Sequence, residues 1–295
     1  MADLSTTEQT FIDTAYRLET EGAELYLEVV GPPDAPPIFY LHSGPGYNSY
    51  SFRDLMGDEL ERYKLIYADQ RGAGRSPADD SELDLDRLAA DVVAILDGLE
   101  LGQTTLLAHG FGAMVALSLA KQYPERMTRL ILVNPWVDMS LLALAMQREA
   151  ARLSENEDEV AAEMTPEERV QQATSQIGAK QLFDAMEFPK AGSRLRLEHA
   201  DAESFAGLTE SVATDPDDTR IWDLKVDPSG IAHPTVILIG KDDKTCYPDQ
   251  AERILSAMPH ALTSLLDAGH YPWLDDPEVF TNLLHEVMAL DPAPT

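Results

Sequence analysis

The stretch LLAHGFGAM at residues 106–114 joins an apolar segment directly to a run of strong helix formers. A strand that turns sharply into a helix displays the residue at the turn. Small residues two positions before and two positions after it let strand and helix approach closely. Ala108 and Gly112 meet this requirement. The displayed residue is Gly110, which has no side chain to react.

Short apolar segments bounded by turn residues recur on both sides of this junction. They lie at residues 37–41, 63–68, 104–108, 129–133 and 235–239. Such runs are typical of parallel strands buried on both faces. Helical spacing of apolar residues marks the segments at residues 84–98, 113–123, 249–257 and 277–288. The alternation predicts an α/β fold with a mostly parallel central sheet and flanking helices, preceded by an antiparallel pair at residues 11–18 and 24–30.

The alternation stops between residues 137 and 230. Four segments in this part look helical and polar, at residues 140–151, 158–163, 166–177 and 198–205. We expect a helical cap at residues 137–230, inserted into a core formed by residues 1–136 and 231–295. An extended helical layer without a lid role is the alternative.

The chain is strongly acidic. Its 52 acidic and 22 basic residues give a net charge of −30 over 295 residues. A field of this sign repels nucleic acids and anionic membranes, so we expect neither as a partner. We expect the charge to reflect adaptation to salt or a need for solubility, with attraction of cationic substrates as the alternative.

Several features of the sequence favour a cytoplasmic protein. The single cysteine, Cys246, excludes an intramolecular disulfide and fits a reducing compartment. No apolar run approaches the ~18 residues that span a bilayer. The N-terminal residues lack the basic and apolar regions of a signal peptide. No metal-ligand spacing appears, so the sequence predicts neither a metal nor another cofactor.

Two further motifs follow predicted strands. HSGPG occupies residues 42–46 and DQRGAGRS occupies residues 69–76. They resemble the H-G-G-P-G and D-Q-R-G-x-G-x-S signatures of the proline iminopeptidase-like family of α/β-hydrolases. The resemblance covers residues 10–136 and 231–290 and fades between them. It implies the α/β-hydrolase fold, a peptidase- or esterase-like hydrolase, and a partner that is a small-molecule ester or amide or a short N-terminal peptide. The oligomeric state is not indicated.

The resemblance also implies an oxyanion hole, in which backbone N–H groups face a developing negative oxygen. Pro45 has no N–H, so Gly44 is the expected donor, beside the N–H of Phe111. Asp69 and Arg71 are expected to hold loops together rather than to touch substrate.

A catalytic acid and a histidine complete the implied site. In this family the acid lies three residues past the glycine that follows a late strand, which selects Asp243, or Asp242 if the register slips by one. The segment DAGHYPWLDDP at residues 267–277 resembles the one that carries the catalytic histidine, His270. The order nucleophile, acid, histidine fits the fold. His109 is expected to be a packing residue and Cys246 a free structural cysteine.

The chain departs from the family beyond the junction. Proline iminopeptidases usually carry G-I-F after the next strand and W-x-x-W-E in the cap. Here residues 134–138 read NPWVD, and the only tryptophan in the cap is Trp222. Acidic cap residues that could bind a substrate amino group are Glu155, Glu157, Glu159 and Glu163. Carboxylates are background in so acidic a chain, so aminopeptidase specificity does not carry over.

A dinucleotide-binding turn is the competing interpretation of the Gly110–Phe111–Gly112 stretch. That fingerprint needs a third Gly or Ala where Val115 stands, and an acidic residue where Asn134 stands. Both requirements fail, so the hydrolase interpretation is preferred.

Glycine at position 110 leaves three hypotheses. The first is a serine hydrolase with its nucleophile replaced, an engineered form that is inactive or strongly impaired. The second is a natural Gly110 protein in which His270 and Asp243 act as a general base on water or on a substrate proton. The third is a ligand-binding module without turnover. The intact acid and histidine count against the third.

Overall fold

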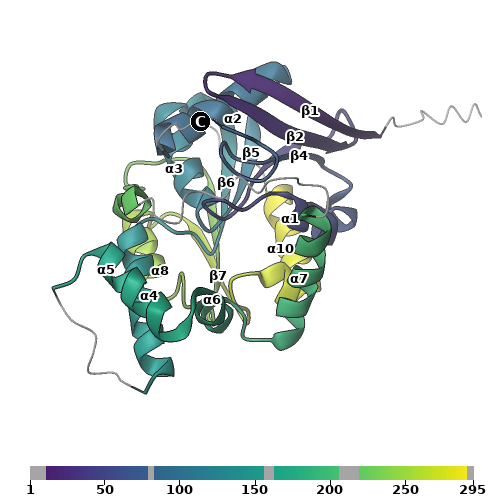
Figure 1. Ribbon diagram of the computed structural model, residues 1–295. Coiled ribbons are helices and arrows are strands. Elements are labelled where there is room, and N and C mark those ends of the chain that lie inside the picture. Colours follow the sequence, from purple (N-terminus) through teal and green to yellow (C-terminus); the bar gives the residue numbers. More distant parts are fainter. Residues whose placement is uncertain (1–10, 79–82, 156–162, 206–218, 291–295) are drawn as a thin grey trace, which may run out of the picture.

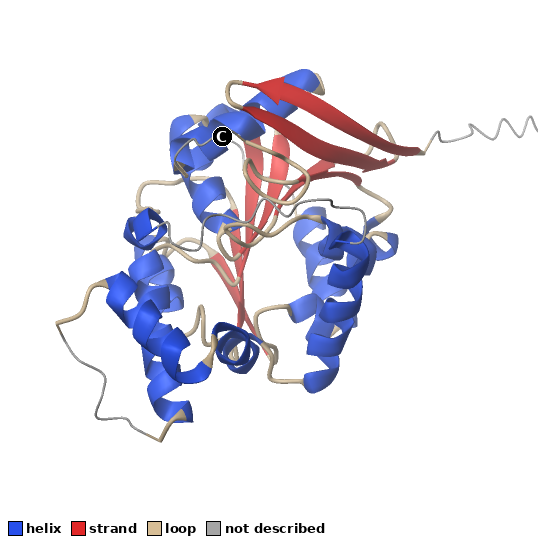
Figure 2. Cartoon of the chain, viewed as in Figure 1, coloured by secondary structure: helices blue, strands red, loops and turns tan. Residues whose placement is uncertain are grey.

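The structure is a computed structural model that describes residues 11–78, 83–155, 163–205 and 219–290. Eight strands form one sheet in the order β1-β2-β4-β3-β5-β6-β7-β8 (Figures 1 and 2). Their bounds are β1 (Ile12–Thr20), β2 (Ala23–Gly31), β3 (Pro37–Leu41), β4 (Lys64–Ala68), β5 (Thr104–His109), β6 (Met127–Val133), β7 (Thr235–Gly240) and β8 (Leu262–Leu266). β1, β2 and β4 pair in antiparallel fashion, and every pair from β4 to β8 is parallel.

The α-helices lie between and after these strands. Their bounds are α1 (Tyr50–Met56), α2 (Leu85–Gly98), α3 (Gly112–Gln122), α4 (Met139–Leu153), α5 (Pro166–Ile177), α6 (Ala179–Glu187), α7 (Ala191–Phe205), α8 (Asp249–Ala257), α9 (Pro272–Asp275) and α10 (Pro277–Ala289). This arrangement is the α/β-hydrolase fold, which confirms the predicted fold class.

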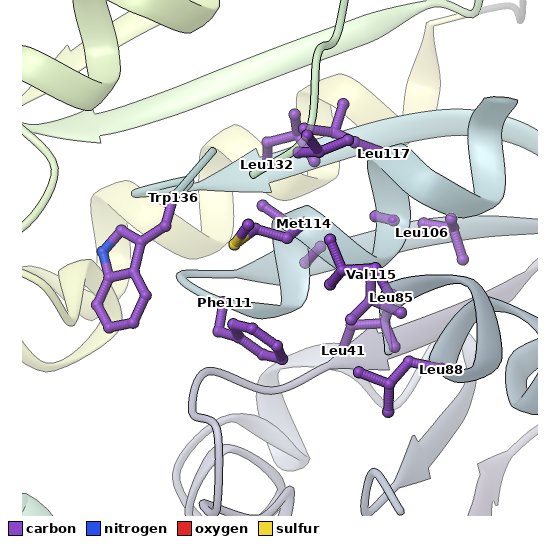
Figure 3. Packing of buried hydrophobic residues seen from close by; sticks show 14 of the residues in the cluster. Leu41, Leu85, Leu88, Leu106, Phe111, Met114, Val115, Leu117, Leu132 and Trp136 are labelled. Atoms are coloured by element: carbon purple, nitrogen blue, oxygen red, sulfur yellow. The ribbon is translucent and has the colours of Figure 1, made fainter. Parts of the chain in front are cut away.

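The central strands are buried on both faces, as their apolar runs predict. In β3, Phe39 and Leu41 join one core, whereas Ile38 and Tyr40 join the other. The first core lies against α2, α3 and α8, and the second lies against α1 and α10, on the opposite side of the sheet in Figure 1. Figure 3 shows the first core around α3, where side chains from β3, α2, β5 and β6 meet.

The segment between β6 and β7 is helical. α4 packs against α5 and α6, and α7 packs against α1 and α9. The expected helix at 158–163 lies almost entirely outside the described residues. The boundary of the cap at residues 137 and 230 remains a prediction.

Four of these elements, β8, α1, α6 and α9, were not expected from the sequence. β8 leaves Leu262 and Leu265 exposed, so it lacks the buried run that marks the other parallel strands. α1 is only two turns long, and α6 buries only Leu182 and Met186. None of the helices within the described ranges is long and apolar enough to cross a membrane.

Asp69 and Arg71 hold loops together, as expected. Asp69 accepts hydrogen bonds from the Ser49 N–H and the Arg75 N–H, each at 2.8 Å. Arg71 pairs with Asp91 through two hydrogen bonds of 2.7 and 2.6 Å. These contacts tie the loop after β4 to α1 and α2.

The start of α3 presses against the end of β3. A Cβ on Gly112 would lie 2.4 Å from the carbonyl oxygen of Leu41 and 2.7 Å from that of His42. These are backbone atoms and cannot rotate away. The requirement for a small residue two positions after the turn is therefore steric.

We expect Gly112→Ala to lower the free energy of unfolding by about 1–3 kcal/mol, because α3 and β3 must separate to admit the methyl group. Urea unfolding measures this. Gly102→Ala is the matched control, since a Cβ there meets nothing within 4 Å, and a change within about 0.5 kcal/mol is expected. Equal losses in both variants would contradict the steric argument.

Candidate active site

Loops that follow four parallel strands meet at one edge of the sheet, where the carboxyl ends of the strands lie. Gly110 follows β5, Asp243 follows β7 and His270 follows β8. The loop at residues 42–46 follows β3 and lies beside them. Asp243 and His270 have no exposed surface.

Gly110 forms the sharp turn between β5 and α3. Its φ of +51° lies in the left-handed region, which costs a non-glycine residue roughly 1–2 kcal/mol. Its N–H donates to the carbonyl oxygen of Val133, and its own carbonyl accepts from Ala113 and Trp136. The turn is thus fixed on both sides, and glycine adopts it without strain.

Asp243 orients His270. Asp243 Oδ2 accepts from His270 Nδ1 at 2.9 Å, and Asp243 Oδ1 accepts from the N–H and the hydroxyl of Thr245 at 2.8 and 2.6 Å. Asp242, the alternative acid, lies in an exposed position. Because Nδ1 carries the shared proton, Nε2 of His270 is left to accept one.

The charge on His270 is set by two opposing effects. Burial disfavours the imidazolium, but the Asp243 carboxylate outweighs it, so the pKa of His270 is raised above its ordinary value. A raised pKa makes Nε2 a better proton acceptor. This is the property that a general base requires.

Three residues that the sequence did not assign to the site hold His270 in place. Trp136 stacks on its ring at 5.5 Å and donates its indole N–H to the hydroxyl of Thr245 at 3.0 Å. The side-chain amide of Asn134 donates to the carbonyl oxygens of Gly269 and His270 at 2.9 and 2.8 Å. Asn134 has a positive φ of 44°, which is uncommon for a residue other than glycine. None of the sequence motifs marks these contacts.

His109 packs beside His270, as expected. Its Nε2 donates to the carbonyl oxygen of His270 at 2.9 Å, and the ring centroids are 4.3 Å apart. Complete burial lowers the pKa of His109 well below its ordinary value, and the neighbouring His270 lowers it further. His109 is therefore neutral and holds the backbone of the histidine loop.

The predicted oxyanion donors flank this cluster. Phe111, at the N-terminus of α3, is fully buried, and Gly44 lies in the loop after β3. Among the residues that the structure describes, the N–H groups of Phe111 and Gly44 donate to no protein acceptor. Both remain free to donate to a substrate oxygen, and their role remains a prediction.

The end of α6 reaches the histidine loop. The backbone N–H of His270 donates to the carbonyl oxygen of Glu187 at 2.9 Å, and that of Lys244 donates to Met186 at 3.0 Å. Burial raises the pKa of the Glu187 side chain to about 7, although His270 acts to lower it. The sequence did not single out Glu187. Of the acidic cap residues it did name, Glu155 and Glu163 are exposed, and Glu157 and Glu159 lie outside the described residues.

Cys246 and Ser43 are two further buried residues. Cys246 is buried, and burial raises the pKa of its thiol well above the ordinary value, so it is an unreactive structural cysteine. Ser43 lies at the site with its hydroxyl 3.5 Å from Nε2 of His270. The sequence interpretation missed it, although the H-G-G-P-G signature has glycine where Ser43 stands.

Known proteins share this fold and match most of the chain. A family model described as alpha/beta hydrolase fold matches residues 36–277. The crystal structure of a proline iminopeptidase-related protein from Thermus thermophilus is 32% identical, with a TM-score of 0.79, over 94% of this chain and 98% of that one. A Pseudomonas syringae pv. syringae protein named as a putative carbamate hydrolase, RutD, is 26% identical over 88% of this chain and 96% of its own length. Est816, described as an N-acyl homoserine lactone degrading enzyme, is 21% identical with a TM-score of 0.66, over 92% of this chain and 99% of that one.

The raised pKa of Glu187 predicts a pH-dependent stability. The folded protein keeps this proton to about pH 7, whereas an ordinary glutamate loses it near 4.5. Between about pH 4.5 and pH 7 the folded state therefore binds more protons than the unfolded state. The free energy of unfolding consequently falls as the pH rises through this range. We expect Glu187→Gln to unfold with the same free energy as the unmodified protein at about pH 4 and to be the more stable of the two at about pH 8.

Urea unfolding at a series of pH values measures the difference. Glu203→Gln, at an exposed position of α7, is the control and should show no such divergence. Parallel stability curves for Glu187→Gln and the unmodified protein would contradict the prediction.

Proposed function

The chain belongs to the alpha/beta hydrolase fold family, and we propose that it hydrolyses small ester or amide substrates with His270 as the general base. One observation carries the proposal: Asp243 holds Nδ1 of His270 at 2.9 Å in a completely buried pair. Burying a carboxylate is costly unless it is paired and hydrogen-bonded. A site without turnover has no chemical need of such a pair.

The proposed chemistry uses Nε2 of His270. This nitrogen accepts a proton from the attacking hydroxyl or water and returns it to the leaving group. Asp243 keeps the ring in the required tautomer and stabilises the imidazolium that forms. The N–H groups of Gly44 and Phe111 stabilise the negative oxygen that develops on the substrate carbonyl.

The names of the relatives support a carbonyl substrate. One relative is named as a putative carbamate hydrolase, and another is described as degrading an N-acyl homoserine lactone. Carbamates and lactones both contain a carbonyl carbon with an oxygen or nitrogen substituent. We carry over this reaction class and no particular substrate. The alternative is a ligand-binding module without turnover, and the assay on 4-nitrophenyl acetate distinguishes the two.

A second candidate, an aminopeptidase, is favoured by Glu187. Glu187 ends α6 beside the histidine loop, where its carbonyl oxygen accepts from the N–H of His270 at 2.9 Å, and the nearby His270 and Asp243 shift the pKa of its carboxyl group in opposite directions. A protonated substrate amine beside it would favour the ionised carboxylate and pair with it. The net charge of −30 would also draw cationic substrates toward the protein.

We expect His270→Gln and Asp243→Asn to lower kcat on 4-nitrophenyl acetate by about 10²–10⁴-fold, because each removes the oriented base. Steady-state release of 4-nitrophenol measures this. His260→Gln, at an exposed position, is the control and should match the unmodified protein. Equal activity of His270→Gln and the unmodified protein would refute the proposal.

The aminopeptidase candidate predicts a substrate-dependent effect of Glu187→Gln. KM should rise at least about tenfold for proline and alanine 4-nitroanilides, since one lost charge-assisted contact costs on the order of 1.5–3 kcal/mol. KM for 4-nitrophenyl acetate, which has no amine, should stay unchanged. A similar rise for both substrate classes would count against amine recognition by Glu187.

A further inference from the structure

Residues 43 and 110 compete for one space beside His270. A Cβ on Gly110 would lie 2.2 Å from Ser43 Oγ and 3.0 Å from Ser43 Cβ. The same Cβ would lie 3.3 Å from Cε1 of His270. The hydroxyl of Ser43 therefore fills the space that a side chain at the turn would occupy, next to the proposed base.

The Ser43 hydroxyl faces the nitrogen that can accept its proton. Ser43 Oγ lies 3.5 Å from Nε2 of His270, and both side chains are buried. Contacts between a nucleophile and its base are often this long without substrate and shorten when substrate binds. Within the described part of the chain, the hydroxyl has no other hydrogen-bond partner, so no structural contact competes for it.

The backbone of Ser43 is held firmly. Nδ1 of the buried His42 donates to the carbonyl oxygen of Ser43 at 2.5 Å, and Nε2 of His42 accepts from the N–H of Gln70 at 2.9 Å. The side-chain amide of Gln70 donates in turn to the carbonyl oxygen of His42 at 2.7 Å. Burial lowers the pKa of His42, which keeps this ring neutral and able to donate on one side and accept on the other.

We propose that Ser43 is the nucleophile of this enzyme and supplies the hydroxyl that Gly110 lacks. The inference rests on the proposed function, because it requires His270 as base. It replaces the hypothesis that Gly110 makes the protein inactive. The nucleophilic hydroxyl is supplied by the loop after β3 instead of by the turn after β5.

The reaction proceeds in two balanced halves. Ser43 Oγ bonds to the acyl carbon while its proton passes to Nε2 of His270, and the carbonyl π electrons move to the oxygen. Collapse of this oxyanion breaks the bond from the acyl carbon to the leaving oxygen or nitrogen, which takes the proton from Nε2 and departs as an alcohol or an amine. Water then attacks the acyl-Ser43 ester, giving its proton to Nε2. Collapse releases the carboxylic acid and returns the proton to Ser43 Oγ.

The oxyanion donors suit this attack. Gly44 directly follows Ser43 in the chain, as Phe111 directly follows Gly110. A donor in the residue after the nucleophile is the arrangement found at the turn in hydrolases of this fold. One of the two expected donors is therefore adjacent to the proposed nucleophile.

Covalent labelling tests the proposal independently of turnover. The intact protein is incubated with diisopropyl fluorophosphate, from which a serine nucleophile displaces fluoride. We expect one adduct, mapped by peptide mass spectrometry to Ser43, absent in Ser43→Ala and retained in Ser118→Ala, a buried serine of α3. An adduct elsewhere, or none, would overturn the proposal. Thermal unfolding checks that Ser43→Ala is folded.

A second variant keeps the test decisive if Ser43→Ala does not fold. Ser43→Cys places a thiol at the same position, and we expect iodoacetamide to alkylate it well before the buried Cys246. Alkylation at equal rates, or of Cys246 first, would overturn the proposal.

Kinetics separates this inference from the proposed function. On 4-nitrophenyl acetate we expect Ser43→Ala to lower kcat at least about 100-fold, as loss of a nucleophile does. Full activity of Ser43→Ala together with loss in His270→Gln would overturn the Ser43 inference and leave the His270 base, acting on water. An adduct on Ser43 without turnover of any substrate would support the nucleophile and refute the proposed function.

The shared space predicts a reciprocal rescue. Gly110→Ser alone should be less active than the unmodified protein, since its Cβ would stand 2.2 Å from Ser43 Oγ. Ser43→Gly combined with Gly110→Ser should recover activity, because one hydroxyl again faces His270 without the clash. A single Gly110→Ser variant that is more active than the unmodified protein would overturn the proposal.

Discussion

The close approach of α3 to β3 sets how near the loop after β3 and the turn after β5 come to each other at the site. No side chain fits at Gly112, because the carbonyl oxygens of Leu41 and His42 already occupy that position. This approach brings the loop after β3 against the turn after β5, so Ser43 and Gly110 adjoin the same histidine. The sheet provides the frame, but the contact between α3 and β3 determines which loops meet.

The polar groups of the site form one connected network between the apolar cores of the protein. Asp243 is satisfied by Thr245 and His270, and Trp136 completes the hydrogen bonding of Thr245. Asn134 and His109 hold the carbonyl of His270. Because each of these groups has a partner, the network fixes His270 without leaving a buried charge unpaired. The end of α6 joins this network through backbone hydrogen bonds, which connect the helical segment to the loops that carry Asp243 and His270.

The central strands and most helices could be predicted from the sequence, because burial on both faces leaves uninterrupted apolar runs. β8 could not, since an edge strand with exposed leucines has no such run. Sequence motifs also identified five residues that meet at one edge of the sheet, namely His270, Asp243, Gly110, Gly44 and Phe111. Ser43, Asn134 and Glu187 were missed, because their importance depends on which loops face each other. Of these three residues, only Ser43 could have been recognised from the sequence, because it stands where the H-G-G-P-G signature has glycine.

The overlap between positions 43 and 110 has an evolutionary consequence. Two sites that share one space are epistatic: the effect of a substitution at either depends on the residue at the other. From the present pair, adding a side chain at 110 crowds the site, and removing the one at 43 leaves no hydroxyl facing Nε2 of His270. With Ser43 as the proposed nucleophile, a single-step path between a serine at the turn and a serine in the loop passes through either two crowded serines or none.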